Sequence, residues 1–312
     1  MQLYDTLRTW WSEASLVELA IAAVVLLLLV WIVVMILTGV NIFSVISMRK
    51  SPPHKIVVFD LDETLGCFVE LGMFWDSVRH VLGDEYTGQS DFNHLMSIFP
   101  EFTRPNIVDI LKYLVKKRRR KECQKIMIYT NNQGPRSWAT MITEYFDSRV
   151  GEKVFDQIIA AFRVRGQDVE LCRTSHDKSR DDLIRCTRIP KDTQICFLDD
   201  QHHPMMDVDN VYYINVKPYT QSLPYEVMAS RYYDHMHIDM SKAEFVKKIT
   251  AFMKGYSYTV TSKSRAEQDV DEVISKQIML HLDGFFNIGL KKNTTVRRRR
   301  TGKRRTLKKG HK

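Results

Sequence analysis

The chain has 312 residues, of which 44% are hydrophobic and 27% are charged, the proportions of a folded globular protein. Its formal net charge of +9 is unevenly spread, because residues 291–312 hold 12 of the 46 basic residues and no acidic residue. Removing those 12 leaves 34 basic residues against 37 acidic ones. Composition therefore excludes wholesale disorder, and charge excludes a basic nucleic-acid-wrapping body outside the tail.

An uncharged apolar run predicts one transmembrane helix over residues 19–40. Its 22 residues make a helix of roughly 33 Å, enough to cross the apolar core of a bilayer. A cleaved signal peptide is disfavoured, because the run is too long and the segment before it is net acidic. Only Arg8 precedes the run, whereas Arg49, Lys50 and Lys55 follow it. This asymmetry predicts a single-pass membrane protein whose later residues face the cytosol or nucleoplasm.

Beyond the membrane segment, short apolar runs alternate with helix-like stretches. Runs that are apolar throughout are typical of strands buried on both faces of a sheet. The expected strands are 55–59, 125–129, 194–198, 211–216 and, more weakly, 157–164, and the expected helices are 105–117, 137–146, 178–186 and 240–254. This alternation predicts an α/β fold with a doubly wound, mostly parallel sheet.

The expected organisation follows from these elements. It comprises a short segment 1–18, the transmembrane helix 19–40, a linker 41–54, a soluble domain 55–254, an extension of uncertain structure 255–290 and a basic, disordered tail 291–312. The tail is a candidate for binding anionic lipid or nucleic acid through charge alone.

Five cysteines are scattered over the soluble part, at Cys67, Cys123, Cys172, Cys186 and Cys196. An odd number without a C-x-x-C pair disfavours a disulfide framework and a zinc knuckle. We therefore expect buried free thiols in a reducing compartment. Cys172, His176 and Cys186 form the one loose cluster, and a metal site there is the less favoured alternative.

Polar groups follow three of the predicted strands at the point where each strand ends. They are Asp60 and Asp62, then Thr130, Asn131, Asn132 and Gln133, then Asp199 and Asp200. In a doubly wound sheet, function gathers at the carboxyl ends of the strands. Packed carboxylates repel one another and need a cation, and hard oxygen ligands inside a cell favour Mg²⁺. Because a carboxylate can also act as a nucleophile, the residues predict metal-assisted phosphoryl transfer.

The stretch FDLDETL resembles the D-x-D-x-[TV] signature of haloacid-dehalogenase-type phosphotransferases. Its Glu63 resembles the NLI-interacting-factor-like branch, the RNA-polymerase C-terminal-domain-type phosphatases. TRPNIVDIL, YTNN and FLDD match in the same order, and HDKSRDDLIRC supplies a candidate lysine, Lys178. The resemblance covers residues 55–235 and implies a haloacid-dehalogenase-like fold. The family often has Asp-Asn where this chain has Asp199–Asp200, which leaves the individual metal ligands open.

The resemblance also implies a role for each of these residues. Asp60 would attack phosphorus and become an aspartyl phosphate, while Asp62 would protonate the leaving alkoxide and then activate water. Thr64 would fix the loop, and the phosphate-binding set would be Thr64, Thr130, Asn131 and Lys178. Mg²⁺ would be held among Asp60, Asp62 through its backbone carbonyl, and Asp200, with Asp199 beside them orienting Lys178.

Other interpretations of single residues remain open. Asp62 can be a helix N-cap, and Thr130 can cap the helix that follows it. Lys153 and Lys191 are alternatives to Lys178 as the phosphate-binding lysine. His202 and His203 are expected to line the cleft as loop residues and not to bind the metal.

Residues 66–103 are rich in aromatic side chains. The resemblance implies that they form only a small flap, which leaves the cleft open to a phosphoprotein substrate. The expected function is a membrane-anchored, Mg²⁺-dependent protein serine/threonine phosphatase, similar in layout to the Dullard-type nuclear-envelope phosphatases. Two alternatives stay open: a catalytically silent polypeptide-binding or tethering protein of the same fold, and a nucleic-acid end phosphatase suggested by the basic tail.

Overall fold

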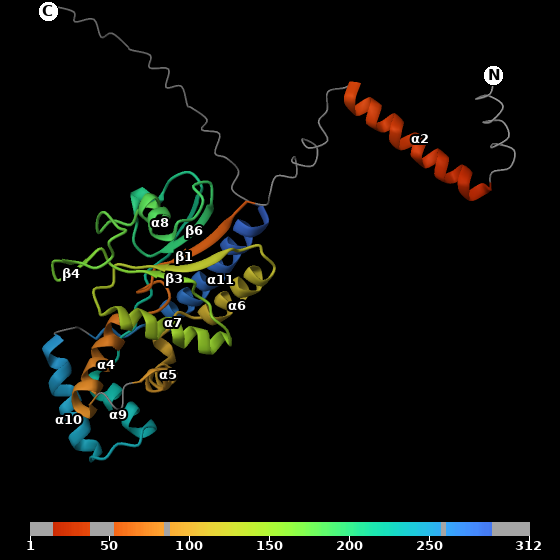
Figure 1. The fold of residues 1–312 in the computed structure, drawn as a ribbon. Coiled ribbons are helices and arrows are strands. Elements are labelled where there is room, and N and C mark those ends of the chain that lie inside the picture. Colours follow the sequence, from red (N-terminus) through yellow and green to blue (C-terminus); the bar gives the residue numbers. More distant parts are fainter. Residues whose placement is uncertain (1–14, 38–52, 84–87, 257–259, 289–312) are drawn as a thin grey trace, which may run out of the picture. The chain divides into compact units, whose positions relative to one another are not determined.

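The computed structural model describes residues 15–37, 53–83, 88–256 and 260–288 (Figure 1). The chain divides into two compact units, Met1–Pro53 and His54–Lys312. The predicted tail at residues 291–312 lies outside the described residues, as do the last three residues of the predicted membrane helix.

In the first unit the apolar run forms one helix, α2 (Leu16–Leu37). The helix begins before residue 19 because Ser15 and Glu18 cap its first turn. The Ser15 amide donates to the Glu18 carboxylate at 2.8 Å, and the Glu18 amide donates to Ser15 Oγ at 3.3 Å. By length and composition α2 is able to cross a membrane.

The second unit is built on a parallel sheet with the strand order β3-β2-β1-β6-β7 (Figure 1). The strands are β1 (Lys55–Phe59), β2 (Lys125–Tyr129), β3 (Gln157–Ile159), β6 (Gln194–Asp199) and β7 (Val211–Asn215). All of their pairings are parallel. The predicted α/β class and parallel sheet are confirmed. The chain runs outward from β1 in both directions, so β1 and β6 flank the point where the strand order reverses.

The weak run at 157–164 is not one strand. Its first part forms β3, and its last two residues form β4 (Arg163–Val164), which pairs antiparallel with β5 (Gln167–Asp168). Arg165 and Gly166 join them with φ of 50° and 82°. Two consecutive positive φ values make the tight turn whose twist suits a hairpin.

Helices cover both faces of the sheet, which explains why its strands are apolar throughout. The larger core packs one face against α6 (Ile107–Arg119), α7 (Arg136–Val150) and α11 (Arg265–Ile288). The smaller core packs the other face against α8 (Arg180–Thr187). Helix α11 lies in the segment for which the sequence made no prediction, and it contributes buried Ile278, Leu282 and Phe285.

The insertion after β1 is helical and larger than the small flap expected. It holds α4 (Phe68–Leu82), α5 (Gln89–Ile98) and a 3-10 turn (Pro100–Phe102). These elements pack with α9 (Tyr225–His235) and α10 (Lys242–Met253) beyond α7 (Figure 1). An edge-to-face contact of Phe74 with Tyr232 ties the insertion to α9, and one with Phe99 joins α4 to the end of α5. The aromatic residues of this segment therefore belong to the larger core, which continues from the sheet into the insertion.

Candidate active site

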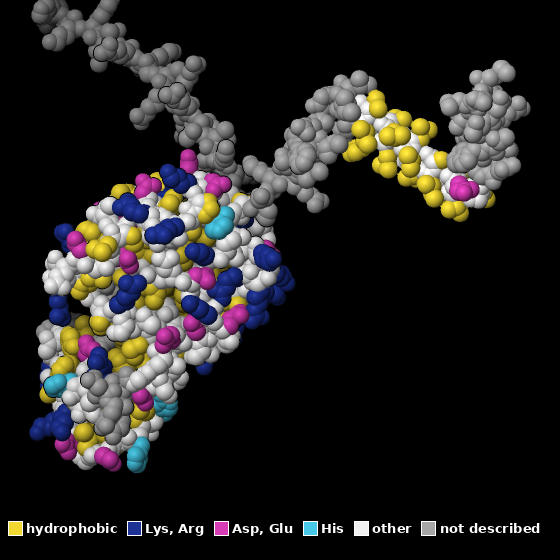
Figure 2. Space-filling model, in the orientation of Figure 1, with side chains coloured by type: hydrophobic (Ala, Val, Ile, Leu, Met, Phe, Trp, Pro, Cys, Tyr) yellow, Lys and Arg dark blue, Asp and Glu magenta, His cyan; other side chains and the backbone are white. Residues whose placement is uncertain are grey.

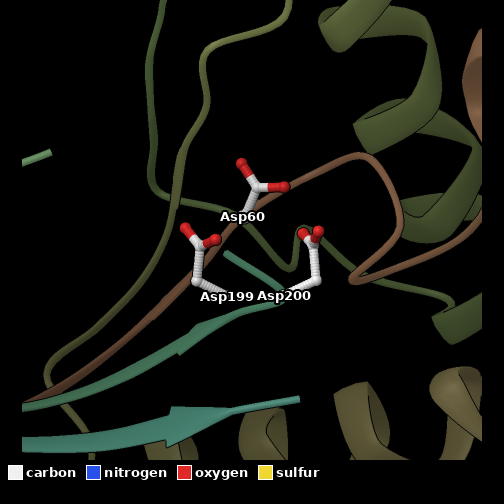
Figure 3. A group of neighbouring side chains, drawn as sticks. All are labelled: Asp60, Asp199 and Asp200. Carbon is white, nitrogen blue, oxygen red and sulfur yellow. The ribbon is translucent and has the colours of Figure 1, made fainter. Parts of the chain in front are cut away.

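Three carboxylates meet at the carboxyl ends of the two central strands. Asp60 follows β1, Asp199 is the last residue of β6, and Asp200 comes next. Because Phe59 pairs in register with Leu198, the strands end side by side. The side chains of Asp60 and Asp199 are buried, and one oxygen from each of the three residues lies within 4.8 Å of the others (Figure 3).

Lys178 is the cation of this cluster. It precedes α8 and is only 2% exposed. Its ammonium donates to Asp199 Oδ2 at 2.7 Å and to Asp60 Oδ1. The neighbouring Ser179 fixes the loop, because its side chain caps α8 and its amide donates to the Tyr129 hydroxyl at 3.2 Å. The alternatives Lys153 and Lys191 are exposed and do not line the site.

The loop after β1 is held by a buried guanidinium. Arg104 donates to the carbonyl oxygens of Thr64 and Glu63, each at 2.6 Å. Glu63 has a φ of 57°, which turns the chain sharply after Asp62. The chain then passes Gly66, where a Cβ atom would lie 2.5 Å from the Phe102 carbonyl oxygen. Only glycine fits there, so the loop geometry rests on close backbone contact.

Asp62 projects into the site, and its two carboxylate oxygens differ in their partners. Its Oδ2 accepts from the Asn132 side-chain amide at 2.6 Å, whereas its buried Oδ1 has no hydrogen-bond partner among the residues that the structure describes. Burial raises the pKa of Asp62 to about 6, although the Asn132 hydrogen bond opposes the shift. A carboxyl group that holds its proton to near neutral pH is suited to general acid catalysis. The Asp62 side chain is not part of the carboxylate triad.

Thr130 and Asn131 follow β2 but do different things. The buried Thr130 hydroxyl accepts from the Asn132 amide at 3.0 Å. The Asn131 side chain instead accepts from Arg173 at 2.8 Å, and Arg173 also donates to the Thr130 carbonyl at 3.0 Å. Arg173 is buried and holds the strand end in place. The sequence interpretation placed Asn132 at the end of the strand without a role of its own, and it did not name Arg173, which no motif marks.

Thr64 lies beside the third carboxylate. Its hydroxyl donates to Asp200 Oδ1 at 3.3 Å, and its side chain is almost completely buried. Thr64 thus contacts the Asp200 side chain, while the Asn215 side-chain amide donates to the Asp200 backbone carbonyl at 3.1 Å. The Thr64 hydroxyl therefore orients Asp200 within the cluster.

The pKa values of Asp60 and Asp199 shift in opposite directions, because their surroundings differ. Burial raises the pKa of Asp60 to about 8, with the Lys178 charge opposing the shift and Asp199 adding to it. Burial also acts to raise the pKa of Asp199, but hydrogen bonds from His203 and Lys178 outweigh it, so the pKa of Asp199 is lowered. The pKa of Lys178 is raised, because Asp60 and Asp199 outweigh its burial. Asp199 and Lys178 thus form the charged pair, and Asp60 takes up a proton easily.

A cavity of about 480 Å³ opens onto this cluster. One side is polar and carries Asp60, Asp62, Thr130 and Lys178. The other side is formed by helices α4 and α7 and includes Val69, Met73, Trp138 and Met141. Gly72 on α4 lies against the Trp138 ring, where a Cβ would approach to 3.2 Å. The cavity thus combines polar groups at the carboxylate cluster with an apolar wall, as ligand-binding cavities commonly do.

The two histidines do not line this cavity, contrary to expectation. His203 lies behind the cluster, with Nε2 at 3.4 Å from Asp199 Oδ2. His202 stacks on Tyr213. The hydroxyl of Tyr213 accepts from the His203 amide at 2.9 Å, which directs the chain away from the cleft after Asp200.

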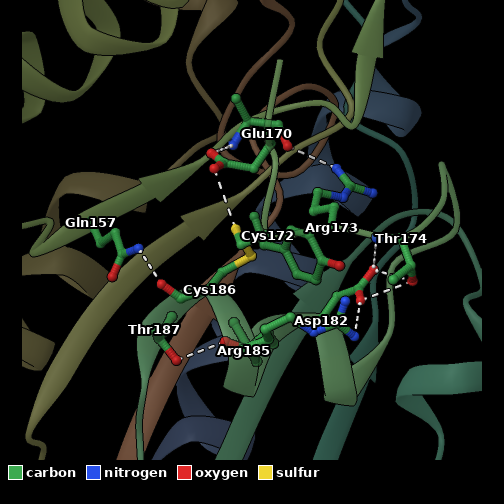
Figure 4. The surroundings of a disulfide bond; sticks show 12 residues. Gln157, Glu170, Cys172, Arg173, Thr174, Asp182, Arg185, Cys186 and Thr187 are labelled. Carbon is green, nitrogen blue, oxygen red and sulfur yellow. Dashed lines mark hydrogen bonds and ion pairs between the residues drawn. A yellow bond between two sulfur atoms is a disulfide. The ribbon is translucent and has the colours of Figure 1, made fainter. Parts of the chain in front are cut away.

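The structure corrects the prediction that all cysteines are free. Cys172 and Cys186 form a disulfide between the loop before Lys178 and the end of α8 (Figure 4). Their 14-residue separation gives no local signal, and only the fold brings their Cα atoms to 5.1 Å. A metal site in this cluster is excluded while the disulfide is closed. Cys67, Cys123 and Cys196 are free and buried, as predicted.

The donor set fits a metal ion. Three carboxylates in one cluster, with Lys178 as the neighbouring cation, retain an excess of negative charge, and hard cations bind oxygen ligands of this kind. Comparisons of the chain with protein-family models, curated proteins and solved structures find no match. The functional argument therefore rests on the geometry of the site.

Proposed function

We propose that the protein is a Mg²⁺-dependent phosphatase of the haloacid-dehalogenase type that hydrolyses phosphoserine and phosphothreonine in proteins. The observation that carries the proposal is the meeting of Asp60, Asp62, Lys178 and the Asp199–Asp200 pair at one edge of the sheet. Nucleophile, proton donor, phosphate-binding cation and metal ligands are thereby available within a single cavity.

In the proposed reaction, an Asp60 oxygen attacks phosphorus while the bond from phosphorus to the serine or threonine oxygen breaks. Asp62 gives its proton to the departing oxygen, so the alcohol leaves neutral. Asp62 then takes a proton from a water molecule as that water attacks the aspartyl phosphate. Phosphate leaves, Asp60 is regenerated, and Asp62 has its proton back. The raised pKa of Asp62, about 6, suits both steps.

Lys178 and Thr130 are positioned to receive the phosphoryl oxygens. Lys178 is already shared between Asp60 and Asp199, so it lies where the oxygens of a phosphate on Asp60 would come. Asp60 and Asp200, with Asp199 nearby, would hold Mg²⁺, which neutralises charge on the transferring group when bound. Arg173 and Arg104 act through the backbone and keep the two loops in register.

A protein substrate is supported by the apolar wall of the cavity. Serine and threonine phosphates have short side chains, and residues next to them in the substrate would reach Val69, Met73 and Met141. These side chains come from α4 and α7 and not from the phosphate-binding loops. The wall is therefore expected to select among phosphopeptides without taking part in the chemistry.

The test is hydrolysis of p-nitrophenyl phosphate and of phosphopeptides by the full chain in detergent, with Mg²⁺ or with a chelator. Asp60→Asn should reduce turnover to background, and the matched change Asp239→Asn, at an exposed position, should not affect it. A phosphorylated intermediate should be released by hydroxylamine, which cleaves acyl phosphates. The proposal would be refuted if the Asp60→Asn variant kept its turnover, or if the chelator left turnover unchanged.

We further propose that α2 crosses the membrane and that the catalytic unit faces the cytosol or nucleoplasm. The basic residues that follow the apolar run support this orientation. In a reducing compartment the Cys172–Cys186 pair would be open. Both thiols should then react with a maleimide in intact cells. A pair that reacts only after added reductant would place the unit on the oxidising side.

A further inference from the structure

Basic residues gather at the edge of the sheet opposite the carboxylates. Parallel strands all begin at one edge, and β1 and β2 begin there with Lys55 and Lys125. Helix α6 runs back to this edge and ends in basic residues. Residues 112–125 include eight basic residues and a single acidic one, Glu122. The amino edge thus carries a dense positive charge, although the second unit without its tail is mildly acidic.

Ion pairs neutralise only part of this charge. The pairs are Lys117–Glu122, Arg118–Asp156 and Arg119–Glu152, at 2.6, 3.4 and 2.9 Å. Lys116, Arg120 and Lys121 are exposed, and no acid in the described part of the chain forms an ion pair with them. With Lys125 they form what we call the amino-edge basic surface. In Figure 2, Lys and Arg side chains gather on the flank of the body where α6 ends.

The positive charge at this edge lowers the pKa of two neighbouring groups, Lys55 and His54. Burial and then the charge of Lys117 lower the pKa of Lys55. Burial and then the charge of Lys125 lower the pKa of His54, with Asp192 opposing. These cations therefore lie close enough to repel one another, and a polyanion that binds the surface would relieve that repulsion.

The same edge is where the second unit joins the rest of the chain. Seventeen residues, 38–54, separate the end of α2 from Lys55, and they can reach at most about 60 Å. The end of α11 is fastened at this edge too, because Lys55 Nζ donates to the carbonyls of Phe285 and Phe286 at 2.8 and 3.0 Å. A tether this short keeps the headgroups of the membrane at high effective concentration near the amino-edge basic surface.

We propose that the amino-edge basic surface binds the anionic phospholipid headgroups of the membrane that α2 crosses. The proposal rests on membrane insertion of α2 and is independent of the proposed phosphatase activity. Lipid is favoured over nucleic acid because the tether supplies it locally. Since Asp60 lies at the other end of β1, a domain docked in this way turns its active site toward the aqueous phase, where protein substrates are.

The experiment uses the full chain in nanodiscs of phosphatidylcholine, with or without about 30% phosphatidylserine. Lysines are acetylated briefly and the sites are read by mass spectrometry. Lys116 and Lys121 should react about fivefold more slowly in the anionic discs, since each basic residue near such a surface contributes about 1 kcal/mol. Lys247 and Lys254 on the insertion side should be unchanged. About 1 M salt should remove the protection, because it screens exposed charges.

A neutralised variant tests the surface directly. It combines Lys116→Gln, Arg120→Gln and Lys121→Asn, the last because Lys121 has a φ of 60°, which Asn tolerates. Protection read at Lys125 should disappear in this variant. Protection should persist in a matched control with Arg165→Asn, Lys247→Gln and Lys254→Gln, which removes three basic residues elsewhere. Arg165→Asn matches Lys121→Asn, because Arg165 also has a positive φ, of 50°.

Two further arms distinguish other sources of binding. A chain that lacks residues 291–312 should keep most of the protection at Lys116. If that deletion abolishes protection, the tail alone binds lipid and the proposal is overturned. Protection of Lys116 by an oligonucleotide, without protection by anionic discs at the same phosphate concentration, would also overturn it and assign the surface to nucleic acid.

Discussion

Replacing Lys178 with methionine tests the charge balance on which the site depends. The substitution keeps the volume of the buried side chain but removes the ammonium that bonds to Asp60 and Asp199. At the 2.7 Å separation from Asp199 the attraction is roughly 6 kcal/mol at an effective dielectric constant of about 20, and desolvation offsets part of it. Leaving buried carboxylates without their partner should lower the free energy of unfolding by about 3–5 kcal/mol near neutral pH.

The loss should depend on pH in a defined direction. In the variant, burial raises the folded-state pKa of Asp60 further above its unfolded value, and it raises that of Asp199, where only His203 still opposes it. Such groups favour folding at low pH, and that contribution is lost as pH rises through the folded pKa. In the parent protein the lowered pKa of Asp199 acts the other way. The stability gap should therefore be small near pH 5 and large near pH 8.

Urea unfolding of residues 51–290 without metal, followed by the fluorescence of buried Trp75 and Trp138, measures the effect. Lys191→Met, at an exposed alternative lysine, should change the free energy of unfolding by no more than about 0.5 kcal/mol. Adding Asp199→Asn to Lys178→Met should recover about 1 kcal/mol or more, because it removes the stranded charge. A loss below about 1 kcal/mol that is the same at every pH would refute the assigned ion pairs.

Three further outcomes are expected. Asp62→Asn should lower kcat on a phosphoserine peptide by about 10²–10⁴-fold and lower it much less on p-nitrophenyl phosphate, whose leaving group needs little protonation; equal losses in a steady-state assay would argue against a proton donor. Mg²⁺ affinity, measured by calorimetry, should rise about tenfold per pH unit up to about pH 8. The reason is that Mg²⁺ must displace the proton that Asp60 holds at its raised pKa. An affinity that does not change with pH would contradict this prediction. Reducing the Cys172–Cys186 disulfide, which closes a loop with a sequence separation of 14, should lower the free energy of unfolding by about 3 kcal/mol in urea titrations. A variant with both residues changed to alanine should not respond to reductant. If that variant does respond, the effect of the reductant does not come from this disulfide.

The sequence alone specified the central strands well. The bounds of β1 and β2 match the predicted runs, because a strand covered on both faces must be apolar throughout and stops where polar residues begin. The same argument placed Asp60, Thr130 and Asp199 at one edge, where the structure also has them. Helix α11 was not predicted, because its buried face mixes apolar residues with Asp271 and Ser275.

The side-chain pairings that the sequence did not predict depend on contacts between segments that the fold brings together. Asn132 bonds to Asp62 and its neighbour Asn131 does not, because the turn after β2 directs the Asn131 side chain to Arg173. Arg173 has no sequence signature, since its partners are a backbone carbonyl and a side chain about forty residues away. The sequence grouped Cys172 with Cys186 only as a less favoured metal site, and the disulfide between them was not predicted. Local pattern records which surfaces are buried and where strands end, whereas side-chain pairing depends on loop paths that only tertiary packing determines.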